Sequence, residues 1–248
     1  MLARKTNNRV EHVTASSSVT VMSGLALEVA VNRWLKPSFE ARTPYRLEID
    51  WRPTTALMKS IAEGERADMI VAIDKSMDKL CADRIVRPET RVTLADSVLG
   101  VGVRQGAAKP DVSTVEAFRR AMLGARAVAY SKAGASGIYF TGLIERLGIA
   151  AEVNARAVTI PMGFTGEKVA SGEADVAIQQ VSELMSVPGV EVAGPFPAEI
   201  QTVSTFDAAI FADAKNPEGA AAFLALLSSP EAAKAYADGG LVSRLQVS

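Results

Sequence analysis

The sequence is poor in the residues that carry redox, metal and covalent chemistry. Its 248 residues include one cysteine, Cys81, and one histidine, His12. A single cysteine cannot form an internal disulfide, and no Cys/His spacing predicts a structural zinc site. Because the one histidine lies in a polar N-terminal stretch, a Ser-His-Asp relay is excluded as well. We therefore expect neither a metal nor another cofactor.

Strong net charge and long apolar runs are also lacking. The 27 basic and 28 acidic residues leave a formal charge of −1, which gives no whole-molecule field for nucleic acid. No stretch approaches the roughly 18 consecutive apolar residues of a membrane span. Residues 1–17 form a polar leader without the apolar centre of an export signal. We expect a periplasmic protein if a signal peptide was removed, and a cytoplasmic one otherwise.

Strand-length apolar runs alternate with segments of helical period along the rest of the chain. The hydrophobic content of 48% is enough for a sizeable core. The predicted strands are 19–22, 45–51, 68–73, 98–103, 127–130, 155–160, 175–180 and 202–211. Such alternation predicts an α/β fold with a mainly parallel sheet.

Five clusters stand where predicted strands end, and four of the five carry hydroxyls, amides or a cation; they are 22–24, 52–55, 131–137, 161–163 and 179–180. Ligands of open α/β sheets collect at this edge, beside the N-termini of the following helices. Taken singly, each residue also fits a helix cap or a solvated charge. Together they predict a crevice that binds a small anion. The candidate ligand-binding residues are Ser23, Arg52, Thr54, Thr55, Lys132, Ala135, Ser136 and Gln180.

Motifs for nucleotide cofactors and paired-carboxylate catalysis are missing. The stretch SKAGASG at 131–137 lacks the GxxxxGK[ST] order of a phosphate-binding loop, and no GxGxxG follows the first strand. The acidic residues between 167 and 183 do not form a catalytic carboxylate pair by spacing alone. Tyr139, one helical turn beyond Ser136, fits a core side chain better than a ligand contact.

The order of these segments resembles type II periplasmic substrate-binding proteins, and most closely their molybdate-binding branch. The resemblance spans about residues 19–240. It is carried by VTVMSG, by TTALMKSIAEGERADMIVAIDKSMDKL, by YSKAGASGIY, by GEADVAIQQVSEL and by KNPEGAAAFLALLSSPEAAKAYADGG.

The resemblance implies two α/β lobes joined by crossover strands, with a ligand cleft between them. Lobe one is expected at 18–101 plus 206–248 and lobe two at 102–205. Family members grip an oxyanion through hydroxyls and helix-start N–H groups, which implies roles for Ser23, Thr54 or Thr55, and Ala135 with Ser136. An ABC-type importer is then the implied membrane partner.

Two features depart from the molybdate-binding pattern. Those proteins typically place a tyrosine near the end of the strand that reads DVAIQQ, where this chain has Gln180. Arg52 and Lys132 also bring full charges to the loops that are expected to bind the ligand. Because a guanidinium grasps a carboxylate with two parallel hydrogen bonds, these cations favour a di- or tricarboxylate.

The blocks ASGIY at 135–139, QQVSEL at 179–184 and AGP at 193–195 resemble a subset of the family that includes aconitate isomerase. Moving a double bond between carbons that carry carboxylates needs cations to stabilise a dienolate and one group to carry the proton. Arg52 and Lys132 fit the first role. Lys132, Tyr139, Ser23 or a nearby carboxylate fits the second.

Two functions follow. The first is capture of a small anion for an importer, and the second is cofactor-independent isomerisation of an unsaturated polycarboxylate. The sequence favours the first and leaves the second open.

Overall fold

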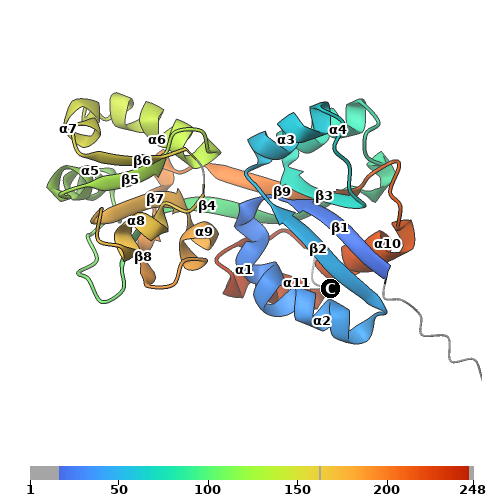
Figure 1. The fold of residues 1–248 in the computed structure, drawn as a ribbon. Coiled ribbons are helices and arrows are strands. Elements are labelled where there is room, and N and C mark those ends of the chain that lie inside the picture. The colour runs from blue at the N-terminus through green and yellow to red at the C-terminus, as the bar shows by residue number, and fades with distance from the viewer. Residues whose placement is uncertain (1–16, 162, 246–248) are drawn as a thin grey trace, which may run out of the picture.

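The computed structural model describes residues 17–161 and 163–245, which form two lobes side by side (Figure 1). The predicted leader, His12 included, lies outside the described residues except for Ser17. Strands β4 (Val92–Arg104) and β9 (Val203–Ile210) run between the two lobes (Figure 1).

Lobe one contains the N-terminal and C-terminal parts of the chain. Its other strands are β1 (Ser17–Ser23), β2 (Tyr45–Trp51), β3 (Met69–Ile73) and β10 (Val242–Ser243). Its helices are η1 (Leu25–Leu27), α1 (Glu28–Ala30), η2 (Val31–Leu35), α2 (Lys36–Arg42), α3 (Thr54–Ala62), α4 (Asp74–Ala82), η3 (Pro88–Thr90), α10 (Pro217–Leu227) and α11 (Pro230–Asp238).

Lobe two is formed by the middle of the chain. Its strands are β5 (Val128–Ser131), β6 (Ala157–Ile160), β7 (Val176–Gln180) and β8 (Val190–Pro195). Its helices are α5 (Val115–Gly124), α6 (Ala135–Arg146), α7 (Ala150–Asn154), α8 (Gly166–Ala170), α9 (Val181–Met185) and η4 (Ala198–Ile200).

The strands follow the order β2-β1-β3-β9-β4-β7-β5-β6, with β8 and β10 also paired to β4. The outer strands of each lobe pair in parallel, as the alternating pattern predicts. The crossover strands β9 and β4 pair antiparallel with their neighbours, so the sheet is mixed rather than parallel throughout. Along β4, Val98 is the last residue paired with β9 and Leu99 the first paired with β7. The predicted lobe boundaries stay a prediction.

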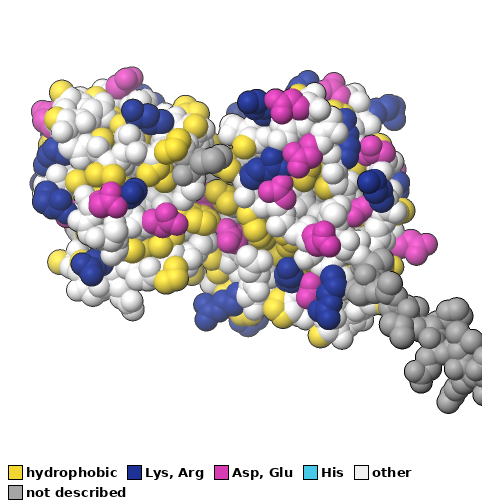
Figure 2. All heavy atoms as spheres, in the orientation of Figure 1, with side chains coloured by type: hydrophobic (Ala, Val, Ile, Leu, Met, Phe, Trp, Pro, Cys, Tyr) yellow, Lys and Arg dark blue, Asp and Glu magenta, His cyan; other side chains and the backbone are white. Residues whose placement is uncertain are grey.

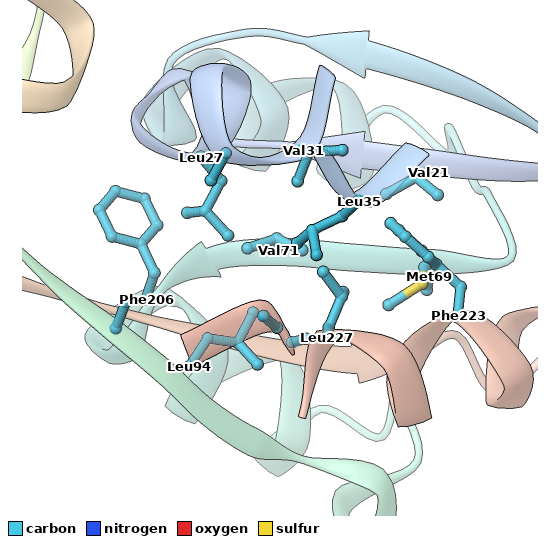
Figure 3. Packing of buried hydrophobic residues seen from close by; sticks show 14 of the residues in the cluster. Val21, Leu27, Val31, Leu35, Met69, Val71, Leu94, Phe206, Phe223 and Leu227 are labelled. Atoms are coloured by element: carbon cyan, nitrogen blue, oxygen red, sulfur yellow. The ribbon is translucent and has the colours of Figure 1, made fainter. Parts of the chain in front are cut away.

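Helices cover both faces of the sheet in each lobe, because alternate strand residues point to opposite faces. In β1, Val21 joins the cluster under α1, α2 and α10, whereas Met22 joins the cluster under α3 and α4. In lobe two, Tyr130 of β5 packs with α5 and α6, whereas Ala129 packs with α8 and α9. Figure 3 shows helix side chains of lobe one packing onto its strand residues.

The outer surface has no large patch of one charge in the view of Figure 2, where basic and acidic side chains alternate over both lobes. Hydrophobic and uncharged side chains predominate along the seam between the lobes in that view. None of the helices in the described ranges is both long and apolar enough to cross a membrane.

Candidate functional site

A crevice lies at the carboxyl ends of the strands, where elements of both lobes meet. Its cavity volume is about 50 Å³, and the space between atoms reaches about 550 Å³ when the open solvent at the mouth is included. Lobe one contributes Gly24, Leu25, Pro53, Thr54, Thr55, Ile73 and Phe206 to the lining; lobe two contributes Ser131, Gly134, Ala135, Ser136, Gly163, Gln179, Gln180 and Glu183. All five clusters at the predicted strand ends therefore reach this one crevice.

Five helices begin at the crevice wall. The residues at the N-caps of η1, α3, α4, α6 and α9 all belong to the lining, and none of the five makes a side-chain capping hydrogen bond. The first N–H groups of a helix have no partner within the helix, and its N-terminus carries a partial positive charge. Since α3, α4 and α6 each span at least two turns, their N-termini bring partial positive charge to the crevice without a cationic side chain.

Glycine allows α6 to start so close to strand β5. A side chain on Gly137 would place its Cβ 1.5 Å from the carbonyl oxygen of Ser131, a backbone atom that cannot move aside. The Ser131 hydroxyl in turn accepts a hydrogen bond from the Gly134 N–H at 3.0 Å. This close approach brings the first turn of α6, with Ala135 and Ser136, to the crevice wall.

Lobe one is also closely packed around Gly24. A Cβ at this position would lie 2.8 Å from Cε1 of Phe206 and 3.5 Å from Oγ1 of Thr54. The end of β1, the start of α3 and the crossover strand β9 therefore meet at one point. The apolar ring of Phe206 forms part of the crevice wall at that point.

Three hydroxyls of the lining have no hydrogen-bond partner within residues 17–161 and 163–245. Thr54 and Thr55 stand in the first turn of α3, and Ser136 stands in the first turn of α6. None of the three hydroxyls makes a hydrogen bond with another residue of the described part of the chain. Hydroxyls at helix N-termini suit an anionic ligand, because they donate to it alongside the backbone N–H groups.

Glu183 is the one ionisable side chain among the described residues of the lining. It stands in the first turn of α9 and is 9% exposed. Burial is the main cause that raises its pKa from 4.5 to about 7; the negative charge of Glu28 raises the pKa further. Hydrogen bonds with the Gln179 side chain and the Gln180 backbone lower it. This carboxyl is therefore poised to take up and release a proton near neutral pH.

Two glutamines frame the carboxyl of Glu183. The Gln179 side chain accepts hydrogen bonds from the N–H and hydroxyl of Thr165, at 2.7 and 2.9 Å, and donates to the Gly163 carbonyl at 3.0 Å. Gln180 is 4% exposed, and its Oε1 has no hydrogen-bond partner among the described residues. Gln179 is thus held in place by its neighbours, whereas Gln180 retains hydrogen-bonding capacity at the crevice.

The structure does not bring every predicted residue into the lining. Arg52 pairs with Asp50 and with Glu65 at 2.8 Å, and donates to the Ser60 hydroxyl at 2.7 Å, all within lobe one. The two terminal nitrogens of its guanidinium bind these partners, and Arg52 is not among the residues that line the crevice. Ser23 is buried beside the lining residue Gly24, and its hydroxyl donates to the Gly24 carbonyl at 3.2 Å.

Lys132 and Tyr139 also stand outside the lining. The Lys132 side chain is exposed to solvent, and its backbone N–H donates to Ile160 in the β5–β6 pairing. The Tyr139 hydroxyl donates to the Ile200 carbonyl at 2.9 Å, while Arg146 stacks over its ring. Tyr139 therefore packs in lobe two, as an apolar helix position predicts. Of the predicted residues, Thr54, Thr55, Ala135, Ser136 and Gln180 line the crevice.

Spacing between acidic residues did not identify Glu183, because no second carboxyl stands among the described residues of the lining. A different signal does point to it. Gln180 ends a buried strand, and Glu183 follows three residues later, in the first helical turn at the same sheet edge. Phe206 carried no comparable signal, since it reads as an ordinary strand residue.

Comparison with known proteins places the chain in a family. The family model of bacterial extracellular solute-binding proteins matches residues 19–242. The chain belongs to this family. Among curated proteins it is similar to an aconitate isomerase from a Pseudomonas species, with 35% identity over 231 residues, which cover 91% of this chain and 87% of the relative.

Solved structures share the two-lobed fold of type II periplasmic binding proteins. The periplasmic molybdate-binding protein of Azotobacter vinelandii aligns with a TM-score of 0.73 and 20% identity, over 90% of this chain and 98% of that one. The sulfate-binding protein SubI of Mycobacterium tuberculosis H37Rv aligns with a TM-score of 0.69 and 16% identity, over 91% and 86%. These likenesses confirm the predicted fold class.

Proposed function

We propose that this protein is a cofactor-independent isomerase of a small unsaturated polycarboxylate of the aconitate type, with Glu183 as its proton carrier. The observation that carries the proposal is a buried carboxyl with a pKa of about 7 inside a crevice whose other described lining residues are uncharged. The 35% identical relative named aconitate isomerase supports the same reaction class.

Helix N-termini and hydroxyls supply the attraction for the substrate carboxylates. A helix N-terminus is equivalent to roughly half a positive charge, and α3, α4 and α6 begin at the crevice. The hydroxyls of Thr54, Thr55 and Ser136 add donors. Because Arg52 is paired within lobe one, the substrate charge is balanced by these dipoles rather than by that guanidinium.

A single carboxyl is sufficient for the proton transfer. The ionised Glu183 breaks a C–H bond of the substrate methylene group and takes the proton, while the electron pair spreads over the adjacent double bond and carboxylate as a dienolate. The protonated Glu183 then returns the proton to the carbon at the other end of the allylic system, which shifts the double bond. The step is balanced without an oxidant or a co-reactant, and a pKa near the working pH suits both directions.

Incubation of the protein with trans-aconitate or cis-aconitate, followed by chromatography, tests the reaction. We expect each isomer to yield the other, and deuterium to enter the carbon skeleton in D₂O because Glu183 exchanges its proton with solvent. E183Q keeps the shape and polarity of the side chain but cannot carry the proton. Its turnover should fall at least about 100-fold.

The control is E48Q, which removes one exposed negative charge from β2 of lobe one. It should retain wild-type turnover. If both aconitate isomers stay unchanged with the wild-type protein, the isomerase proposal is wrong. If E183Q turns over like the wild type, Glu183 is not the proton carrier.

A second candidate function is capture of a small anion for an ABC-type importer. The family description and the structural likeness to molybdate- and sulfate-binding proteins favour it. Calorimetry over a panel of oxyanions and polycarboxylates separates the two functions. Capture requires tight, stoichiometric binding of one anion without turnover, and the absence of heat across the whole panel would reject it.

A further inference from the structure

The pairing of strand β4 changes partners at Leu99. The last residue of β8 pairs with Gly100, and the first residue of β9 pairs with Val98. Only Leu99 separates these two positions on β4, so the connecting residues 196–202 must loop out beside it. Leu99 is also the first residue of β4 that pairs with β7. We call Leu99 together with residues 196–202 the junction, because both crossings between the lobes pass through it.

The side chain of Gln201 supplies hydrogen bonds that a continuous strand would give to Leu99. Its Oε1 accepts from the Leu99 N–H at 2.9 Å, and its Nε2 donates to the Leu99 carbonyl at 3.0 Å. The same amide accepts from the Thr202 N–H at 3.0 Å and donates to the Phe196 carbonyl at 3.3 Å. A glutamine amide can do this because it carries both an acceptor and two donors. One side chain therefore binds both crossings.

Both walls of the crevice continue directly from the junction. Leu99 pairs in register with Gln180, which lines the crevice and immediately precedes α9. In the other direction, β9 runs from the junction to Phe206, which lines the crevice in lobe one. Because α9 already packs against η1 and α1, a change of angle at the junction moves the two walls apart rather than closer together.

We propose that Gln201 is a positioning residue that sets the spacing of the two crevice walls: its amide ties β4 to the connection that leads into β9. Changes of angle between domains are absorbed by a few residues at the ends of elements. A rotation at the junction would break hydrogen bonds of the Gln201 amide, so the intact amide holds the walls in the observed arrangement. The inference does not depend on which anion the crevice binds, or on whether that anion is turned over.

Pulsed EPR distance measurements on the ligand-free full chain test this role. Spin labels at K59C in α3 and E145C in α6, in a C81S background, report the distance across the crevice. Both positions are exposed, and the two helices lie on the same side of the two lobes (Figure 1). Q201M keeps the length of the side chain but removes all of its hydrogen bonds. We expect its distance distribution to become broader and to shift to longer distances.

The matched control is Q105M, which makes the same chemical change in the turn after β4. Gln105 is exposed, and its side chain makes no hydrogen bond with another residue of the ranges that the structure describes. Q105M should therefore reproduce the distance distribution of the parent. Urea unfolding of both variants, measured in parallel, separates a change of lobe spacing from a loss of stability.

A distribution in Q201M that matches the parent would overturn the proposal, even if Q201M is less stable, because a merely structural role lowers stability without moving the lobes. If Q201M does not fold, Q201E provides the second variant. Its carboxylate still accepts from the N–H groups of Leu99 and Thr202 but places an oxygen against the carbonyls of Leu99 and Phe196. We expect the distribution to broaden there too, and parent-like distances in Q201E would count equally against the role of Gln201.

Discussion

The two walls of the crevice are built alike but differ in their chemistry. In both lobes a strand ends, a glycine allows close packing, and a helix begins with a hydroxyl in its first turn. The described lining of lobe one consists of the hydroxyls of Thr54 and Thr55 and of apolar residues, while the nearby cation Arg52 is paired with Asp50 and Glu65. Lobe two adds the titratable carboxyl of Glu183 and the two glutamines beside it.

This difference suggests that the two walls of the crevice have different functions. Under the proposed function, the helix starts of both lobes attract the anion, and Glu183 of lobe two carries the proton. Because an ionised Glu183 would repel an anion, the two tasks depend on each other through pH.

The largest effect is expected where the lobe-two wall is packed most tightly. In G137A the new methyl group would overlap the Ser131 carbonyl, so the first turn of α6 must move away from β5. Overpacking against rigid backbone should cost about 3 kcal/mol of stability, measured by urea unfolding, and should abolish ligand binding. G142A on the same helix is the matched control, since its Cβ meets only the Arg146 side chain at 3.5 Å. G142A should be neutral or slightly stabilising; equal stability of both variants would contradict the packing argument.

The next effect is the pH dependence of stability that Glu183 contributes. Its pKa is raised to about 7 in the folded protein, so between pH 4.5 and 7 the folded state holds a proton that the unfolded chain has lost. This contribution is fully present at low pH, is lost as the pH rises through that window, and then levels off.

Comparison of wild type with E183Q isolates this contribution from the other carboxyls. Relative to E183Q, the wild type should lose roughly 3 kcal/mol of stability from pH 4 to pH 8. Urea unfolding at several pH values measures the difference. Parallel curves for the two proteins would show that Glu183 titrates normally in the folded state.

The smallest effect is expected from single hydroxyls, and it compares the two walls directly. T54A removes a donor from lobe one and S136A removes one from lobe two. Each should weaken binding of trans-aconitate about tenfold, as one charge-assisted hydrogen bond of ~1.5 kcal/mol implies. Binding is measured by calorimetry with each substitution added to E183Q, because E183Q prevents turnover during the titration. Ser113 lies outside the lining, so S113A should bind like its parent; unaltered binding in T54A and S136A would remove both hydroxyls from the site.

Several features of the site were predictable because strand ends are local in sequence but convergent in space. The segments around Gly24, Thr54, Ser136, Gly163 and Gln180 each follow an apolar strand. Parallel strands place their carboxyl ends at one edge of the sheet. A fold of this class therefore brings these segments together. Thr54, Thr55, Ala135, Ser136 and Gln180 all line the crevice for this reason.

The charged residues were less predictable, because a side chain as long as arginine can reach several partners. Arg52 follows its strand as closely as Thr54 does, yet its guanidinium turns to Glu65, thirteen residues further along the chain. The sequence does not distinguish Glu183 from the other acidic residues, because its burial is set by the tertiary structure. Burial and partner choice depend on which segments pack together, and no local pattern specifies that.

The sequence by itself determined the alternation of strands and helices, and with it the edge of the sheet where hydroxyls and helix N-termini gather. The tertiary structure decided which charges remain there. Removing a carboxyl from water raises its pKa, and a guanidinium with two carboxylates nearby is neutralised; both effects depend on distances between segments far apart in the chain. Hydrophobic period and turn chemistry are local, whereas the electrostatics of the crevice arises only when the two lobes meet.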